Sequence, residues 1–112
     1  MKETPRLNIS KSLELFDQAC TLVPGGVLGA RKPTDFINGE YPIFLESGKG
    51  CRLIDVDGNE FVDFLCGYGP IILGYREEAV DRAVYDQVSG KGFCFTLTQP
   101  FQNRLAKKIH DL

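Results

Sequence analysis

The stretch from Cys51 to Gly74, CRLIDVDGNEFVDFLCGYGPIILG, constrains the fold more than any other part of the chain. Its first half has two strand-like runs on either side of Asp57-Gly58-Asn59. Asp-Gly between such runs is a strong hairpin signal, because Gly supplies the positive φ of the turn. Its second half packs aromatic residues, Gly and Pro into a tight apolar segment. The stretch therefore predicts an antiparallel hairpin followed by a sharply turned connection.

The hairpin strands are expected at Cys51–Val56 and Glu60–Leu65. A third strand is expected at Tyr41–Leu45, on the sheet edge because Pro42 cannot donate to a ladder. Glu46–Gly50 is expected as the turn that follows it. Three antiparallel strands are the minimum for independent stability, and they still need something to pack on.

Apolar residues at helical spacing predict three helices around this sheet. The first runs from the N-cap Ser10 to Val23, where Pro-Gly-Gly ends it. The second follows a glutamate pair and runs to about Ser89, and the third has Thr98 as N-cap with Pro100 in its first turn. The predicted fold class is α+β: an N-terminal helix, a small three-stranded antiparallel sheet, then two helices.

Size and charge exclude several classes of function. The 112 residues allow one domain at most, and 13 basic against 15 acidic residues give a net charge of −2, which argues against nucleic-acid binding. No apolar run approaches the ~18 residues needed to span a bilayer, and the polar N-terminus is no signal peptide. We expect a cytoplasmic protein with no membrane partner.

The cysteines indicate neither a disulfide framework nor a metal site. Cys20, Cys51, Cys66 and Cys94 are irregularly spaced, form no C-x-x-C pair and accompany a single His. No secretory context favours disulfides, and zinc needs a denser ligand set. Four reduced, mostly buried thiols are expected.

A glycine-rich segment, Pro24–Lys32, carries Arg31 in a loop. It lacks the Gly-Lys-Ser/Thr ending and the preceding strand of a phosphate-binding P-loop. A guanidinium on such a loop can grip a carboxylate through two hydrogen bonds, although spacing alone predicts an ordinary surface arginine.

The acidic residues of the hairpin resemble the start of a calcium loop. An EF-hand also requires helical flanks and a later Glu, which hairpin strands do not offer. Asp57 and Asn59 are therefore predicted to form the turn by hydrogen-bonding their own backbone, with no metal bound.

Tyr68 lies between two glycines and before Pro70, where backbone can approach closely. It is either a core residue with a satisfied hydroxyl or a platform for a flat ligand. His110, on the last helix, is expected to be exposed, with no nucleophile placed beside it.

The two late helices show apolar faces that so small a sheet cannot cover, and the apolar stripe of the last helix is unfinished at Leu112. This pattern predicts the opening segment of a larger protein.

Several motifs in order resemble the N-terminus of a known family: PGGV, YPIF, GKGCRLIDVDGNEFVDF and GYGPIILGY. They are similar to class III aminotransferases, which are fold-type I pyridoxal-phosphate (PLP) enzymes, and most to their glutamate-1-semialdehyde aminomutase branch. The resemblance covers about Ser12 to Ile109.

The resemblance implies a role for two residues. Arg31 matches the arginine that binds the substrate carboxylate, and Tyr68 matches the aromatic residue that lines the substrate pocket near the cofactor ring. The aminomutases usually carry Trp at the position of Tyr68. A plain aminotransferase, acting between an amino acid and a keto or aldehyde acid, is therefore expected at least as much as an aminomutase.

The resemblance also implies what residues 1–112 do not supply. The lysine that carries the cofactor, the aspartate on its ring nitrogen and the phosphate loop match no residue here, and none of the seven lysines fits. We expect an N-terminal, minor-domain segment without the large cofactor-binding domain, inactive alone, from an enzyme that is a homodimer. Two alternatives remain: a non-catalytic interaction module, and an enzyme of the same family that isomerises or decarboxylates its substrate.

Overall fold

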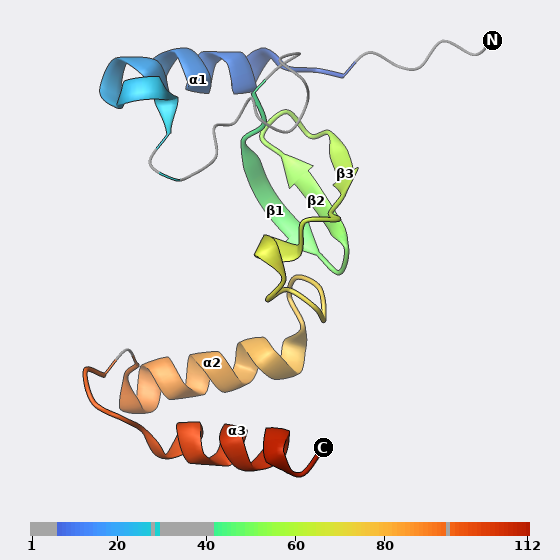
Figure 1. Ribbon diagram of the computed structural model, residues 1–112. Coiled ribbons are helices and arrows are strands. Elements are labelled where there is room, and N and C mark those ends of the chain that lie inside the picture. The colour runs from blue at the N-terminus through green and yellow to red at the C-terminus, as the bar shows by residue number, and fades with distance from the viewer. Residues whose placement is uncertain (1–6, 28, 30–41, 94) are drawn as a thin grey trace, which may run out of the picture. The chain divides into compact units, whose positions relative to one another are not determined.

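The computed structural model describes residues 7–27, 29, 42–93 and 95–112, so Arg31 and Cys94 lie outside the described residues. The chain divides into two compact units, one ending at Glu77 and one beginning at Glu78. The predicted α+β class, with three helices and a three-stranded antiparallel sheet, is confirmed. The elements follow the order α1 (Ser10–Leu22), β1 (Leu45–Lys49), β2 (Arg52–Asp55), β3 (Glu60–Val62), α2 (Glu78–Lys91) and α3 (Pro100–His110) (Figure 1).

The three strands pair in chain order, and both pairings are antiparallel. β1 and β2 are joined by a two-residue turn at Gly50-Cys51, which sets Lys49 opposite Arg52. Gly50 has a φ of 58°, a conformation that suits Gly because it has no Cβ. On the other side of β2, Arg52 lies opposite Val62 of β3. The predicted hairpin around Asp57-Gly58-Asn59 is therefore present.

The first strand lies later in the chain than predicted. The sequence predicts a strand at Tyr41–Leu45 and a turn at Glu46–Gly50, but β1 occupies Leu45–Lys49, so both predictions are wrong. The residues LESGK have little intrinsic preference for a strand. They pair because the tight turn at Gly50-Cys51 aligns them with β2, and this pairing outweighs the local preference.

A buried carboxylate organises the turn between β2 and β3. The side chain of Asp55 has no exposed surface. Its Oδ1 accepts the backbone N–H groups of Asp57 (3.0 Å) and Asn59 (2.7 Å), and its Oδ2 accepts the amide group of Asn59 (2.8 Å). Asn59 also donates to the carbonyl oxygen of Asn8 at 2.6 Å. A buried carboxylate requires such partners, and here they fix the turn.

Helix α1 is capped by a residue of the hairpin. Ser10 is its first helical residue and Ile9 occupies the N-cap position without a side-chain bond, so the prediction of Ser10 as N-cap is wrong. The carboxylate of Asp57 accepts hydrogen bonds from the N–H groups of Lys11 (2.7 Å) and Ser12 (2.8 Å) and from the Ser12 hydroxyl (2.5 Å). Asp57 therefore anchors α1 on the sheet. The prediction that its side chain hydrogen-bonds its own backbone is wrong.

The Pro-Gly-Gly segment ends α1, as predicted, and folds back on it. Gly26 is buried with a φ of 69°, and a Cβ at this position would lie 2.9 Å from Cε2 of Phe16 and 3.1 Å from Sγ of Cys20. Only Gly fits this close approach. The rest of the predicted stripe is less buried than expected, since the exposed fraction of Leu13 is 43%.

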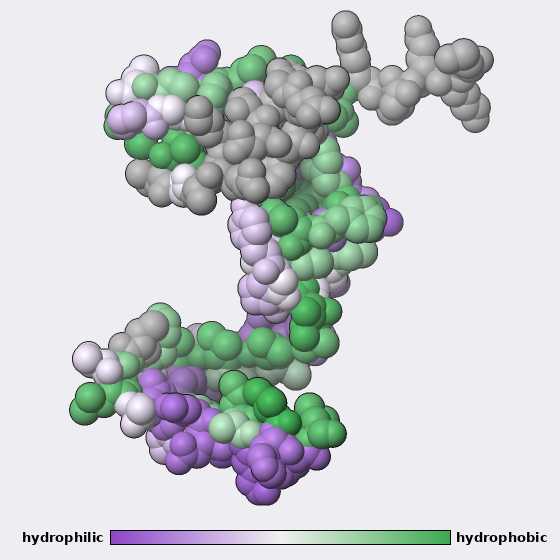
Figure 2. All heavy atoms as spheres, viewed as in Figure 1, coloured by the Kyte–Doolittle hydropathy of each residue, from purple (hydrophilic) through white to green (hydrophobic). Residues whose placement is uncertain are grey.

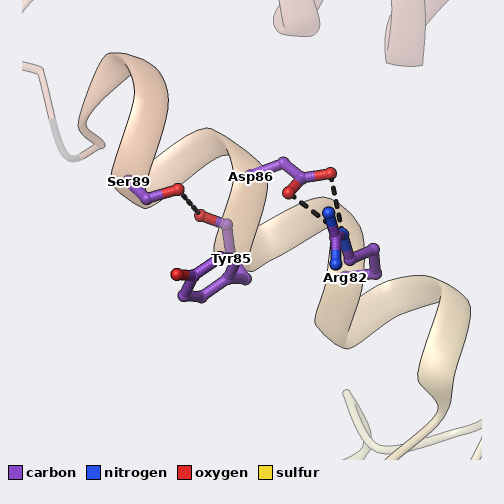
Figure 3. Close-up of polar contacts among 4 residues, drawn as sticks. All are labelled: Arg82, Tyr85, Asp86 and Ser89. Atoms are coloured by element: carbon purple, nitrogen blue, oxygen red, sulfur yellow. Dashed lines mark hydrogen bonds and ion pairs between the residues drawn. The ribbon is translucent and has the colours of Figure 1, made fainter.

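The second unit consists of α2, α3 and their connection. Helix α2 runs past Gly90, where the sequence predicts its end, to Lys91. Arg82 forms an ion pair with Asp86 one turn later, and the hydroxyl of Ser89 donates to the carbonyl of Tyr85 (Figure 3). Helix α3 begins after Gln99, which takes the N-cap position that the sequence predicts for Thr98.

Apolar side chains of both late helices lie exposed (Figure 2). Neither helix has a buried residue in the described ranges. The prediction that both late helices carry apolar faces is confirmed. None of the described helices is long and apolar enough to cross a membrane. The exposed apolar residues of the two helices are Val80, Val84, Tyr85, Val88, Phe101, Leu105 and Ile109.

The cap at Asp57 predicts a pH-dependent anchor for α1. Desolvation raises the pKa of Asp57, but hydrogen bonds from Ser12, Lys11 and Ser10 together lower it below its usual 3.8. Because the folded-state pKa is lowered, the stabilisation is present above pH 3.8 and is lost as the pH falls through the lowered value. Protection of the Lys11 and Ser12 amides against hydrogen exchange should decrease over that range.

Substitution of Asp57 tests the same anchor at neutral pH. Asp57→Ala removes the acceptor, so the Lys11 and Ser12 amides should exchange about tenfold faster, while Asp57→Asn keeps one oxygen and should have a smaller effect. Asp17→Ala, at an exposed position of the same helix, serves as the control. Equal acceleration by Asp57→Ala and Asp17→Ala would contradict the cap.

Candidate functional site

Tyr68 lies in a left-handed turn between β3 and α2. Cys66, Gly67, Tyr68 and Gly69 follow one another with φ values of 51°, 59°, 63° and 112°. A residue other than Gly is strained by about 1–2 kcal/mol in this region. Such strain persists only where surrounding contacts fix it, and it concentrates at functional sites. The turn therefore marks Tyr68 as a candidate site residue.

Backbone hydrogen bonds hold the turn at Tyr68 directly. Its N–H donates to the carbonyl of Leu65 at 3.0 Å, and the N–H groups of Gly69 and Ile71 both donate to the carbonyl of Cys66 at 3.0 Å. The side chain is 65% exposed. The sequence leaves two interpretations of Tyr68 open. Its exposure in the described part of the chain contradicts a core residue and agrees with an aromatic ring presented at the surface.

Asp63 closes the beginning of this turn. Its Oδ1 accepts the N–H groups of Leu65 (2.8 Å) and Cys66 (3.1 Å), and its Oδ2 accepts the hydroxyl of Tyr75 at 2.8 Å. These bonds draw the chain out of the sheet, so β3 ends at Val62 and not at Leu65 as predicted. One half-buried carboxylate thus joins the two ends of the segment that carries Tyr68.

Gly74 and Tyr75 close the other end of the segment. Tyr75 exchanges two backbone hydrogen bonds with Gly50, at 2.8 and 2.9 Å. Its ring lies over Gly48, where a Cβ would be 2.9 Å from Cγ of Tyr75. A Cβ on Gly74 would lie 2.8 Å from the carbonyl oxygen of Gly50. The two glycines permit the close approach that ties this end to the β1–β2 turn.

The Asp63–Tyr75 pair keeps one protonation state near neutral pH. The hydrogen bond from Tyr75 lowers the pKa of Asp63, desolvation partly offsets this, and the N–H groups of Leu65 and Cys66 lower it further. The same hydrogen bond raises the pKa of Tyr75 above its usual 10.0, and burial and the charge of Asp63 add to this. Asp63 is therefore ionised and Tyr75 protonated.

A shallow apolar hollow of about 510 Å³ lies beside the sheet. Its lining is apolar except for Asp63, and Tyr68 is not among the lining residues. The side chain of Tyr68 is exposed outside this hollow. The hollow is lined by Ile43, Leu45, Leu53, Phe61, Val62, Asp63, Phe64 and Leu65.

Arg31, His110 and the cysteines are the other residues that the sequence analysis singles out. Arg31 lies outside the described residues, so its distance from Tyr68 is not defined. His110 is exposed, as predicted. No cluster of three His, Cys, Asp or Glu residues that could hold a metal ion occurs in residues 7–27, 29, 42–93 and 95–112. Cys20 and Cys51 are exposed and Cys66 is half-buried, so the prediction of mostly buried thiols is wrong for these three.

Sequence reasoning missed Asp63 and Tyr75 as parts of this site. An aspartate three residues before a glycine-rich turn can accept backbone N–H groups, and this spacing is the available signal for Asp63. No comparable local signal exists for the Tyr75 hydroxyl, because its partner lies at the far end of the loop.

Comparison with known proteins places the chain in a family. The sequence model of the aminotransferase class-III family matches residues 36–112. The chain therefore belongs to the class III aminotransferases, and the resemblance seen in the motifs is confirmed.

Individual relatives agree with this assignment. The chain is 58% identical over 107 residues to 3-aminobutyryl-CoA aminotransferase of Cloacimonas acidaminovorans, covering 96% of this chain and 26% of that protein. It is 38% identical over 104 residues to glutamate-1-semialdehyde 2,1-aminomutase 2 of Exiguobacterium sp., and the match covers 93% of this chain and 24% of that protein. A solved structure of a transaminase with PLP bound superposes with a TM-score of 0.78 at 28% identity, and the match covers 95% of this chain and 24% of that one. The chain thus spans about a quarter of the length of these proteins.

The described residues do not fit a site that holds PLP by themselves. A cofactor-bearing lysine must stand in an enclosed pocket beside groups that bind the ring and the phosphate. Every lysine in the described ranges is exposed, namely Lys11, Lys49, Lys91, Lys107 and Lys108. None of these five lysines is enclosed, as a cofactor-bearing lysine must be.

Two glycines provide a matched test of the anchor at Gly74. Gly74 and Gly58 have φ values of 86° and 85°, but a Cβ at Gly58 meets no atom within 4 Å. Gly58→Ala should lower the free energy of unfolding by about 1–2 kcal/mol through backbone strain alone. Gly74→Ala should lower it by about 2–5 kcal/mol, because the new methyl group also displaces Gly50. Chemical denaturation measures both, and equal losses would contradict the close approach.

Proposed function

We propose that this chain is the N-terminal, minor-domain segment of a PLP-dependent aminotransferase that transfers an amino group between an amino compound and a keto or aldehyde acid. The observation that carries the proposal is the 58% identity to an aminotransferase, compared with 38% to an aminomutase. The exposed apolar faces of α2 and α3 support a segment that packs against further protein. PLP, when bound, serves as the electron sink that carries the amino group between substrates.

The proposal extends to the cellular location and assembly of the complete enzyme, and to the activity of residues 1–112 by themselves. The complete enzyme is a cytoplasmic homodimer whose partners are its substrates, with no nucleic acid or membrane. Residues 1–112 alone are inactive, which the exposed lysines of the described ranges support. A stand-alone interaction module is disfavoured, because a module that folds alone would not leave Phe64, Ile72 and Leu97 with exposed fractions of 92%, 82% and 82%.

Tyr68 forms a wall of the substrate pocket in this proposal. Its strained backbone and its exposed ring support this role, because the turn presents a flat aromatic surface at a fixed position. A ring of this kind binds by contact area and does not require a charge on the substrate. Tyr68 can therefore contact the amino donor and the amino acceptor alike.

Arg31 has a narrower role in this proposal. The most similar relative named above acts on a 3-aminoacyl thioester, which has no free carboxylate near its amine. A keto acid acceptor does carry a carboxylate, and a guanidinium binds such a group through paired hydrogen bonds. Arg31 should therefore bind the acceptor and contribute little to binding of a thioester donor.

The reaction itself is tested with the complete enzyme and two substrate sets. An aminotransferase should convert 3-aminobutyryl-CoA only when a keto acid such as 2-oxoglutarate is added, with stoichiometric formation of the new amino acid. The alternative aminomutase, which relatives such as the Exiguobacterium enzyme favour, moves the amino group within one molecule. Turnover of glutamate 1-semialdehyde without an added keto acid would therefore contradict the proposal.

The role of Arg31 is tested by separating the two half-reactions. Arg31→Ala should raise the KM for the keto acid by about 10- to 100-fold, the effect of losing charge-assisted hydrogen bonds, and leave the KM for the thioester unchanged. Arg82→Ala removes an arginine that pairs with Asp86 on an exposed helix and serves as the control. A KM for the keto acid that does not change, or equal increases for both substrates, would rule out the clamp.

A further inference from the structure

The turn that carries Tyr68 depends on one carboxylate at its base. Asp63 binds two N–H groups at the beginning of the turn and the Tyr75 hydroxyl beyond its end, so both carboxylate oxygens are occupied. Between these points the chain passes through four consecutive residues with positive φ, from Cys66 to Gly69. Two strained residues that are not Gly keep this conformation only when their surroundings fix it. Asp63 and its donors supply that restraint.

Tyr75 is a fixed point for this carboxylate. Its backbone is paired with Gly50 and its ring lies on Gly48, so the position of its hydroxyl is set by the β1–β2 turn. The hydroxyl then sets the carboxylate plane of Asp63. The position of Tyr68 is therefore connected to the sheet through the side chains of Asp63 and Tyr75.

We propose that Asp63 and Tyr75 form a clamp that positions Tyr68 as a pocket wall, which makes both of them positioning residues for the proposed amino-group transfer. This inference rests on the role of Tyr68 in the proposed function. The clamp acts at all pH values near neutrality, because Asp63 stays ionised and Tyr75 stays protonated. It restrains the wall permanently and is not a switch.

Hydrogen exchange tests the clamp without any cofactor or substrate. Tyr75→Phe removes one hydroxyl and keeps the ring on Gly48 and the backbone pairing with Gly50. The Leu65 and Cys66 amides should exchange about threefold to tenfold faster in this variant. Tyr85→Phe, at an exposed tyrosine of α2, removes the same hydroxyl group elsewhere, so it is the control and should change neither amide.

Kinetics of the complete enzyme test whether the clamp acts through Tyr68. Tyr75→Phe should lower kcat/KM for the amino donor by about tenfold. In a Tyr68→Ala background the same substitution should cause no further loss, because the wall that it positions is gone. Asp63→Asn keeps an oxygen for the two N–H groups, so it should retain more activity than Asp63→Ala.

Each outcome separates this inference from the proposed function. Unchanged exchange of Leu65 and Cys66 in Tyr75→Phe overturns the clamp whatever the enzyme does. Additive kinetic losses of Tyr75→Phe and Tyr68→Ala also overturn it, because the two residues then act independently. If Tyr68→Ala alone leaves kcat/KM unchanged, the role of Tyr68 in the proposed function fails, and positioning by the clamp fails with it. Accelerated exchange together with non-additive losses supports the inference.

Discussion

The buried carboxylate of Asp55 is the interaction on which the first unit depends. It gathers the backbone and side-chain donors of the β2–β3 turn, and so fixes where the next residues point. Asp57 then meets the N-terminus of α1, and Asn59 meets the carbonyl oxygen of Asn8. Asp55→Ala would leave several donors without a partner, at about 1–3 kcal/mol for each one that stays buried. Among the described residues, the helix and the sheet are therefore joined by these polar groups.

The same physical solution recurs at the end of the next strand. Asp63 accepts N–H groups that the ladder no longer pairs, much as Asp55 does at the end of β2. In both places a short strand ends because a carboxylate competes with the ladder for backbone donors. The two turns differ in what they deliver. The first turn presents Asp57 to a helix, and the second presents the ring of Tyr68 to the surroundings of the sheet.

The sequence predicts the features that local chemistry determines, and it misses those that distant partners determine. The Asp-Gly turn, the Pro-Gly-Gly stop and the three amphipathic helices all have local signals, and all are present. β1 has no such signal, because LESGK becomes a strand only by pairing with β2. The cap on α1 was assigned to the adjacent Ser10, whereas the actual acceptor, Asp57, is far away in the chain. The flanking glycines single out Tyr68 as a candidate, but no local signal predicts the hydrogen bond from Tyr75 to Asp63, since it depends on how the loop closes.

Under the proposed function, a charged contact and an aromatic contact together allow one pocket to serve two chemically different substrates. A transfer from a thioester to a keto acid requires that each occupies the same place in turn, although only the second carries a carboxylate. A movable aromatic wall would adapt to either substrate at an entropic cost on each binding event. A wall held by Asp63 and Tyr75 avoids that cost, because its conformation is already restrained before either substrate arrives. In the proposed function, discrimination between the two substrates then falls to Arg31, which responds to charge, and the restrained ring of Tyr68 supplies the contact that both share.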